Sequence, residues 1–284
     1  MRLNTRQFNV YNLAVIMKCM TDRERSIRLE GIVLRHWDWG EADRMLVLFS
    51  LELGKVRAVA KGVRRLRSRK AGHVEPFTRV SLQLARGRDM LIVTQAETLE
   101  AFLPLREDLM LTTYASYVVE LLDRFTYEEG ENRALYRLLV ETLRRLSSAG
   151  ESTLIVRYFE IRLMDLVGFR PQLFECASCG ETIQAENQYF SADKGGVLCP
   201  RCGRLDHTAR PVSLGALKYL RHLQRSPFGE IAGVTIPGAV NSEMENLMQY
   251  YITYLLERGL NTPAFLRRLR QEMSTHEEPS EAVE

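Results

Sequence analysis

The fold is decided by the segment Ile27–Gly62, which reads IRLEGIVLRHWDWGEADRMLVLFSLELGKVRAVAKG. Its apolar residues alternate with polar ones or form short runs, and Gly40 and Gly54 mark turns between the runs. Alternation is typical of a half-buried β-strand, and a short apolar run is typical of a fully buried one. The segment therefore predicts strands at Ile27–Arg35, Arg44–Leu51 and Lys55–Ala60.

Two further strands are predicted at Phe77–Ala85 and Met90–Glu97, after turn signals of the same kind. Five short strands within about 75 residues favour a small closed barrel, for which the OB-fold is the commonest five-stranded form. An SH3-like barrel fits the number of strands nearly as well. The turn after the first strand is expected to carry His36, Trp37 and Trp39.

The pattern changes to that of amphipathic helices after Pro104. One helical face gathers the apolar side chains of Tyr114, Tyr117, Val118, Leu121, Leu122 and Phe125. Capping signals predict further helices, and these run from Asn132 to Leu146, from Ser152 to Val167, from the capping box of Ser242 and Glu245 to Gly259, and onward from Thr262-Pro263.

We therefore expect an α+β protein with several domains. An N-terminal extension at 1–25 precedes an OB-fold barrel at 26–104, and a helical domain follows at 105–270. The segment 271–284 contains five Glu and no Lys or Arg, which predicts a solvated acidic tail.

The composition excludes several classes of protein. With 284 residues and 45% hydrophobic content, the chain is long enough to bury a full core. No apolar run approaches the roughly 20 residues that cross a bilayer, which excludes a transmembrane helix. Residues 1–19 only loosely imitate a signal peptide, because Lys18 and other polar residues interrupt their apolar stretch. We expect translation to start at Met20, and residues 1–19, with Cys19, to carry no function.

Four cysteines form two pairs, Cys176-Ala-Ser-Cys179 and Cys199-Pro-Arg-Cys202, separated by 19 residues. Two such turns supply the four thiolates that zinc prefers in a closed, structural site. We therefore predict a zinc finger at 174–206 with one structural zinc ion, inserted in the helical domain. A pair of redox dithiols and a site that no longer binds metal are the alternatives. His207 is expected to be an exposed loop residue, since four cysteines already complete the shell.

Positive charge is concentrated in the predicted barrel. The whole chain has a net charge of only +3, whereas residues 26–104 contain 14 Lys and Arg against nine Asp and Glu. No acidic residue occurs between Glu52 and Glu75. This interval holds eight cations, which favour a phosphate backbone over a merely solvated surface: Lys55, Arg57, Lys61, Arg64, Arg65, Arg67, Arg69 and Lys70.

Aromatic side chains complete this prediction, since bases stack on them regardless of sequence. Trp37 and Trp39 are candidates for stacking, with burial in the core as the equal alternative. Catalytic motifs give no comparable signal. The chain lacks a Gly-Lys-Ser/Thr phosphate loop, HExxH and GxSxG, so nucleotide hydrolysis is not expected.

Several motifs together resemble the RecO family of bacterial DNA repair and recombination proteins. In the barrel they are Glu30-Gly-Ile-Val-Leu-Arg35, Trp39-Gly-Glu-Ala-Asp-Arg44, Gly54-Lys55, Ala58-Val-Ala-Lys-Gly62 and Glu75-Pro-Phe77. Beyond it they are Leu103-Pro-Leu-Arg106, Phe159-Glu-Ile-Arg-Leu-Met164, Gly168, and the cysteine pairs with Phe190-Ser191 and Gly195-Gly196 between them. The resemblance extends from Ser26 to Leu269.

This resemblance implies an N-terminal OB-fold and a helical domain that often carries a zinc finger. It implies a cytoplasmic, nucleoid-associated and non-enzymatic mediator that binds single- and double-stranded DNA and anneals complementary strands. Its expected protein partners are RecR, RecA and single-strand binding protein, whose acidic tail docks on the helical domain. Arg124 and Arg133, near the ends of two predicted helices, are our candidates for receiving that tail.

Two other functions remain open from the sequence. Basic barrels with zinc sites also occur in RNA-binding and translation-associated modules. A metal-dependent nuclease or phosphotransferase is the less favoured alternative. Competition between single-stranded DNA and RNA separates the first alternative from the RecO-like function, and product formation with magnesium identifies the second.

Overall fold

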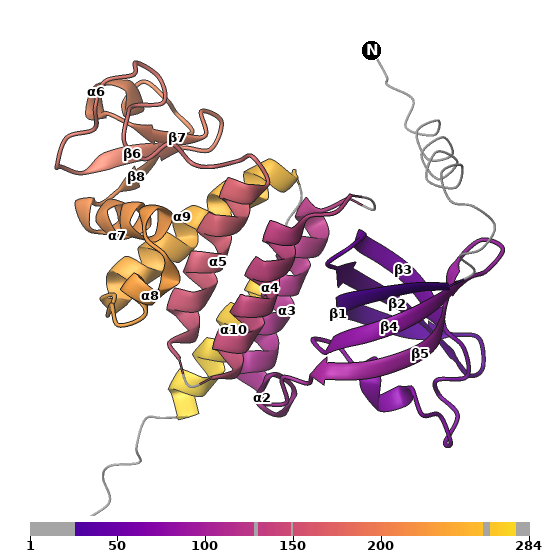
Figure 1. Ribbon diagram of the computed structural model, residues 1–284. Helices are drawn as coiled ribbons and strands as arrows, with labels where there is room; N and C mark the ends of the chain where they lie inside the picture. Colours follow the sequence, from indigo (N-terminus) through magenta and orange to yellow (C-terminus); the bar gives the residue numbers. More distant parts are fainter. Residues whose placement is uncertain (1–25, 128–129, 149, 258–261, 277–284) are drawn as a thin grey trace, which may run out of the picture.

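The computed structural model describes residues 26–127, 130–148, 150–257 and 262–276. A β-barrel lies at one end of the molecule, helices form its middle, and a small three-stranded sheet lies at the other end (Figure 1). The predictions for residues 1–25, including the start at Met20, lie outside the described residues.

The barrel closes in the strand order β1-β2-β3-β5-β4. Strands β3 and β5 run parallel, and the other neighbours are antiparallel. The closed five-stranded barrel, followed by helices, confirms the predicted OB-like fold. Its strands are β1 (Ser26–Trp39), β2 (Asp43–Ser50), β3 (Gly54–Ala60), β4 (Arg79–Arg86) and β5 (Leu91–Glu100), with the 3-10 helix η1 (Ala71–His73) between β3 and β4.

Strands β1 and β2 are buried on both faces. One face fills the barrel through Leu29, Val33, Leu46 and Leu48. The other face joins the hydrophobic core of the helices through Ile32, Leu34, Val47 and Phe49. Successive side chains of a strand point to opposite faces, so the run from Met45 to Phe49 is apolar at every position because both faces are covered.

The first strand is longer than predicted. It continues to Trp39, where Trp37 lies opposite Met45 and Trp39 lies opposite Asp43. His36 and both tryptophans therefore belong to β1, and the prediction that they form the turn is wrong. Polar and aromatic residues alternate here because this end of the strand is only partly covered.

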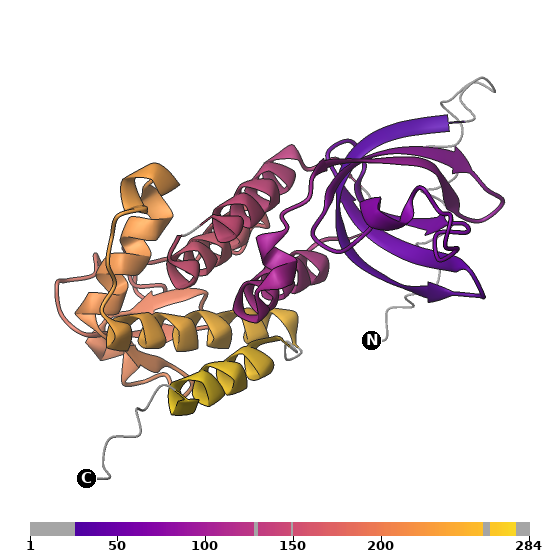
Figure 2. The same ribbon diagram turned by 90° about the horizontal axis from the view of Figure 1, so that it is seen from below.

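The helical part contains α2 (Pro104–Glu107), α3 (Leu109–Phe125), α4 (Arg133–Ser147), α5 (Ser152–Leu166), α7 (Leu214–Arg225), α8 (Phe228–Ile231), α9 (Gly238–Leu256) and α10 (Thr262–His276). Helix α10 lies along α3, as Figures 1 and 2 show. None of the helices in the described residues is long and apolar enough to span a bilayer.

One predicted cap is confirmed and two are wrong. Asn132 accepts a hydrogen bond from the backbone N of Leu135 at 3.0 Å, as a helix cap does. Ser152 is already the first residue of α5. Helix α9 begins at Gly238, before the predicted capping box, and Glu245 instead pairs with Arg270 of α10 at 2.7 Å.

Helix α10 extends into the segment for which the sequence predicts an acidic tail. The helix reaches His276, so residues 271–276 are helical, and residues 271–273 are exposed; residues 277–284 lie outside the described part. The residues that hold the helix precede this segment, because Leu266 and Leu269 are buried and Arg270 donates to the hydroxyl of Tyr114 at 3.0 Å. The solvated tail stays a prediction.

Strands β6 (Gln188–Ser191), β7 (Gly196–Leu198) and β8 (Arg210–Val212) form a three-stranded sheet in the order β7-β6-β8. The short helix α6 (Pro200–Gly203) follows β7 and contains Cys202, and Cys199 directly precedes it. Ser213 caps α7 directly after β8 by accepting from the backbone N of Ala216 at 3.1 Å. The sheet is thereby joined to the helices without a linker.

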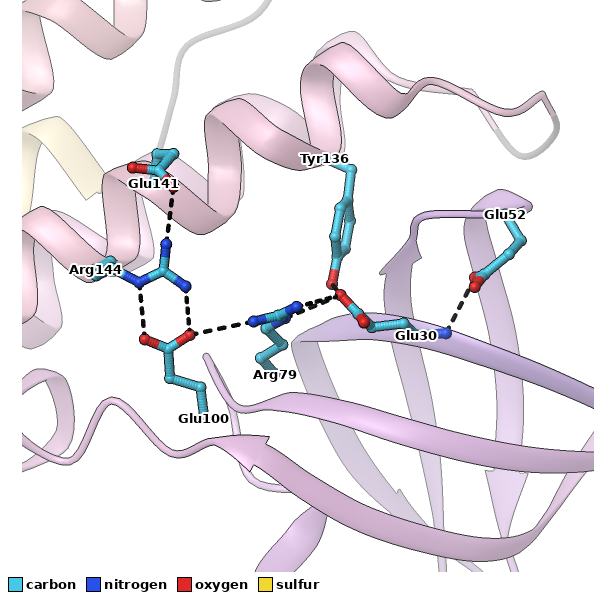
Figure 3. A network of polar contacts seen from close by, with 7 residues as sticks. All are labelled: Glu30, Glu52, Arg79, Glu100, Tyr136, Glu141 and Arg144. Carbon is cyan, nitrogen blue, oxygen red and sulfur yellow. Dashed lines mark hydrogen bonds and ion pairs between the residues drawn. The ribbon is translucent and has the colours of Figure 1, made fainter.

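A polar network ties the barrel to α4 (Figure 3). Glu30 of β1 accepts from the hydroxyl of Tyr136 at 2.7 Å and pairs with Arg79 of β4 at 2.8 Å. Arg79 also pairs with Glu100 at 3.5 Å, and Glu100 binds the guanidinium of Arg144 through both oxygens, at 2.8 and 3.0 Å. The hydrogen bond from Arg144 lowers the pKa of Glu100, so the carboxylate stays charged at neutral pH.

Substitution of Arg79 tests this network. We expect R79A to lower the free energy of unfolding by about 1–3 kcal/mol, since two half-buried carboxylates lose a charged hydrogen-bond partner. Urea denaturation followed by circular dichroism measures the change. The control is R28A, which removes an exposed cation from the same sheet and is expected to change stability by less than about 0.5 kcal/mol. Equal losses in the two variants would contradict the role of the network.

A second polar cluster lies inside the helical part. The carboxylate of Glu160 is fully buried, pairs with Arg157 at 2.7 Å and accepts from the hydroxyl of Tyr117 at 2.5 Å. Burial raises the pKa of Glu160 to about 7, although Arg157 and Tyr117 act in the opposite direction. The folded protein therefore retains a proton that the unfolded chain releases near pH 4.3, the approximate value for a free Glu.

This proton makes stability depend on pH. Unfolding releases it between the two pKa values, so the free energy of unfolding falls as pH rises through that interval. We expect E160Q to remove about 2 kcal/mol of this decline between about pH 5 and pH 8. Denaturation across that range measures it. E107Q, at an exposed position, is expected to keep the wild-type profile, and a wild-type profile in E160Q would contradict the assignment.

Candidate nucleic-acid interface and metal centre

Residues 61–70, called the basic segment below, are held on the barrel on both sides. Gly62 adopts a φ of 65°, which favours glycine, and its backbone N donates to Asp43 Oδ1 at 2.7 Å. Val63 and Val74, on either side of the charged residues, are buried in the barrel core. Residues 64–70 thus project from a fixed base beside the turn between β1 and β2.

Two of the predicted DNA-binding cations hold the segment in place. The guanidinium of Arg64 donates to the carbonyl of Glu41 at 3.2 Å and pairs with Asp38 at 3.3 Å. Lys70 Nζ donates to the carbonyl of Val93 at 3.0 Å, and burial lowers the pKa of this amine against the opposing effect of Asp43. Both side chains have partners within the chain.

Lys55 lies in the contact between the barrel and the helices. Its Nζ donates to the backbone carbonyl of Asp123 at 2.7 Å and to Asp123 Oδ1 at 2.9 Å. The side chain is only 11% exposed. This ammonium group fastens β3 to α3, whereas Arg57, two residues later on β3, is exposed.

The remaining cations are exposed and unpaired. Within the described residues, none of their side chains forms a hydrogen bond or ion pair: they are Lys61, Arg65, Arg67 and Arg69. Trp39, next to the turn on which this segment rests, is 49% exposed. These five residues are called the basic surface below. Trp37 is not part of it, because it packs on the helical core and lies beneath Arg35, at 5.3 Å from Cζ to the ring centroid.

Mutual repulsion among unpaired guanidinium groups decreases when a polyanion binds beside them. A phosphate backbone supplies such charge at regular spacing, and an exposed indole offers a flat apolar face for a base. The basic surface thus has the chemistry of a nucleic-acid interface.

The two arginines expected to receive a partner's acidic tail each have an acidic neighbour. Arg124, in the last turn of α3, lies 4.0 Å from Glu120. Arg133, the first residue of α4, pairs with Glu131. Both guanidinium groups are exposed, so their role in partner binding stays a prediction.

The four cysteines converge on one point. The sulfur atoms of Cys176, Cys179, Cys199 and Cys202 all lie within 4.8 Å of one another. A tetrahedral zinc ion with Zn–S bonds of about 2.3 Å places its sulfurs roughly 3.8 Å apart, and the Cys179 and Cys199 sulfurs are 3.9 Å apart. The donor set therefore fits a metal ion in a closed shell.

The thiols of the cluster differ in pKa. Burial raises the pKa of Cys176, but hydrogen bonds from the backbone of Cys179, Cys199 and Ser178 outweigh it and bring the value to about 6. The hydrogen bond with Cys199 and burial raise the pKa of Cys202 to about 12. Cys176 is therefore a thiolate at neutral pH, the form that binds metals. His207 is exposed and lies outside the sulfur cluster, as predicted.

Gly180 and Gly203 each follow one of the cysteine pairs, and a side chain is disfavoured at the two positions for different physical causes. Gly180 has a φ of 75°, as a tight turn around a metal requires. At Gly203 a Cβ atom would lie 2.3 Å from the ring of Tyr189, so close packing against β6 excludes a side chain.

Sequence reasoning missed the residues that join the barrel to the helices. Tyr136 and Glu30 are 106 positions apart, and Lys55 and Asp123 are 68 positions apart. No local spacing signals such pairs. The run Met45–Phe49 is apolar at every position, and this is the sequence feature that marks a strand covered on both faces.

Family models match both parts of the chain. The model described as "Recombination protein O N terminal" matches residues 24–102, and the one described as "Recombination protein O C terminal" matches residues 106–264. The boundary between the two matches falls at the end of β5 and the start of α2, where the barrel gives way to helices.

Curated relatives are similar over most of their length. A protein of Roseiflexus sp. (strain RS-1) is 44% identical over 254 residues, which cover 89% of each chain. A protein of Desulforudis audaxviator (strain MP104C) is 39% identical over 245 residues, or 86% of this chain and 98% of the relative. Both relatives are named "DNA repair protein RecO".

Loss of the metal ion tests the cysteine cluster. We expect a strong chelator, or the double substitution C176S/C179S, to lower the melting temperature, because metal binding contributes directly to the folding free energy. Differential scanning calorimetry with metal analysis of the purified protein measures both quantities. The exposed control H207A is expected to retain metal and stability. An unchanged melting temperature in the metal-free protein would contradict a structural metal.

Proposed function

The chain belongs to the RecO family of DNA repair proteins, and from this premise we propose that it is a DNA-binding mediator of recombination without catalytic activity. In this proposal it binds single- and double-stranded DNA, anneals complementary strands, and acts with RecR to load RecA onto DNA coated by single-strand binding protein. It acts in the cytoplasm, at the nucleoid where the DNA lies.

The basic surface is the observation that carries the proposal. It places four exposed, unpaired cations and one exposed tryptophan around the base of one barrel turn. Other cations of the same segment hold the surface in shape, since Arg64 and Lys70 bind backbone carbonyls of the barrel. Because the backbone of this surface is already held in place, binding of phosphates costs little conformational entropy there.

Annealing follows from the same chemistry. Two complementary strands repel each other through their phosphates, and a cationic surface that neutralises part of this charge lets them approach. Contacts to phosphate and unspecific stacking position a strand without reading its sequence. The bases are then left to select their partners by pairing, as annealing of any sequence requires.

We propose that the cysteine cluster holds one zinc ion with an architectural role. Cys176, Cys179, Cys199 and Cys202 would fill its shell and leave no position for substrate or water. The ion would brace the sheet β7-β6-β8 against α7 and α9, at the end of the molecule opposite the barrel (Figure 1). It would not meet DNA bound at the basic surface.

We also propose that Arg124 and Arg133 receive the acidic tail of single-strand binding protein. Both flank the connection between α3 and α4, and a carboxylate-rich peptide would compete with Glu120 and Glu131 for their guanidinium groups. Because the acidic neighbours can bind the arginines again when the peptide leaves, the contact with the peptide would be reversible.

Annealing of two complementary oligonucleotides precoated with single-strand binding protein tests the function as a whole. We expect the protein to accelerate duplex formation and the acceleration to need no nucleotide or metal cofactor in solution. Binding of single-stranded DNA and RNA of equal length, measured in competition, tests the nucleic acid. No acceleration, or a clear preference for RNA, would overturn the proposal.

The salt dependence of DNA affinity tests the basic surface. We expect the triple substitution R65A/R67A/R69A to flatten the slope of log affinity against log salt by about 2, since each phosphate contact on a single strand contributes roughly 0.7. Fluorescence anisotropy at several salt concentrations measures the slope. The control R204A removes an exposed cation beside the cysteine cluster and should leave the slope unchanged. An unchanged slope in the folded triple variant would move the DNA site elsewhere.

A further inference from the structure

One apolar side chain stands at the tip of the basic segment. Leu66 has a relative exposure of 106%, so it makes no packing contact with the described part of the chain. Its neighbours in sequence are Arg65 and Arg67, both exposed and unpaired. A leucine projecting fully into water amid cations has no structural role in the isolated protein.

The tip has a defined backbone shape. The backbone N of Arg65 donates to the carbonyl of Gly62 at 3.2 Å, and that of Ser68 donates to the carbonyl of Arg65 at 2.9 Å. Leu66 and Arg67 are therefore the central residues of a tight turn, where side chains point away from the chain. The anchors on either side, Val63 and Lys70, hold this turn at a fixed place on the barrel.

The charge around Leu66 defines the ligand. Its neighbours attract phosphates, which in a single strand lie beside the unpaired bases. A bound strand thus brings apolar base faces to the position of the leucine. Apolar side chains that enter nucleic acids in other proteins wedge between neighbouring bases and separate them.

A second exposed leucine shows what distinguishes this one. Leu205 is 77% exposed, but it lies beside the cysteine cluster between Arg204 and Asp206 and has an acidic neighbour. Its surroundings do not favour a polyanion. Single exposed leucines are common on protein surfaces. Leu66 differs because it lies at the centre of a turn between two unpaired arginines, so an apolar side chain stands between two groups that can bind phosphates.

We propose that Leu66 inserts between neighbouring bases of single-stranded DNA while Arg65 and Arg67 hold the flanking phosphates. This inference rests on the proposed DNA-binding function and adds a contact to the bases that the charges alone do not supply. Unstacked bases are exposed for pairing, so the wedge would help a bound strand to find its complement.

Binding to two strands with equal phosphates tests the proposal. One strand has a mixed base sequence, and the other is an abasic strand of the same length. We expect L66A to weaken binding to the first strand about fivefold, because the lost methyl groups no longer leave water on binding. The abasic strand should bind both proteins equally, and the salt slope should not change, since no cation is removed.

Two further measurements make the result specific. A strand that contains 2-aminopurine should brighten less with L66A than with the wild type, because fewer bases are unstacked. L66M keeps an apolar side chain of similar size and should restore both affinity and fluorescence. L205A is the matched control and should behave as wild type. Full exposure of Leu66 means that L66A should melt at the wild-type temperature.

The possible outcomes separate this proposal from the proposed function. If L66A binds both strands like the wild type while R65A/R67A/R69A flattens the salt slope, the segment binds phosphates and the wedge is wrong. Equal weakening on both strands would also overturn the wedge, since abasic DNA offers nothing to separate. If no substitution in the segment affects DNA binding, both proposals lose this surface, and a protein partner becomes its occupant.

Discussion

The whole architecture depends on two strands that are buried on both faces. β1 and β2 fill the barrel with one set of side chains and pack on the helices with the other. Each large apolar side chain buried in this way stabilises the fold by about 1.5–3 kcal/mol, so the contact between barrel and helices is part of the core. The ion pairs around it, at Glu30 and at Lys55, fix the direction in which the two parts meet. A barrel so attached moves together with the helices.

This attachment divides the cations of the barrel into two groups. Lys55 and Arg79 face the helices, where carboxylates meet them and burial favours pairing. The cations of the basic surface face water without acidic partners in the described residues. A charge in the first group stabilises the fold, and a charge in the second group is available to a ligand. The distinction between these two groups depends on position relative to the helices and not on residue type. Arg64 and Lys70 belong to neither group, because they bind the carbonyls of Glu41 and Val93 on the barrel itself.

The sequence was sufficient for the strands, the change to helices and the cysteine cluster, because each rests on local spacing. Alternation and short apolar runs locate strands. Each CxxC spacing brings two sulfurs together, and two such turns supply the four thiolates of a metal site. The parts that failed depend on distant contacts. Trp39 reads as a turn residue until its partner Asp43 is known, and Ser242 reads as a cap because nothing nearby reveals that Glu245 binds Arg270. The eight cations could not be sorted for the same reason, since Asp123 lies 68 positions from Lys55.

In the proposed function, the fixed joint would constrain how DNA and a protein partner are brought together. The basic surface lies on the barrel, whereas Arg124 and Arg133 lie on α3 and α4, across the apolar contact that β1 and β2 make. A flexible linker would let the two contacts vary in separation, and binding at one would not restrict the other. The shared core removes that freedom. A strand held at the barrel and a tail held at the helices would therefore be presented at a constant distance, which raises the effective concentration of one for the other without any new contact.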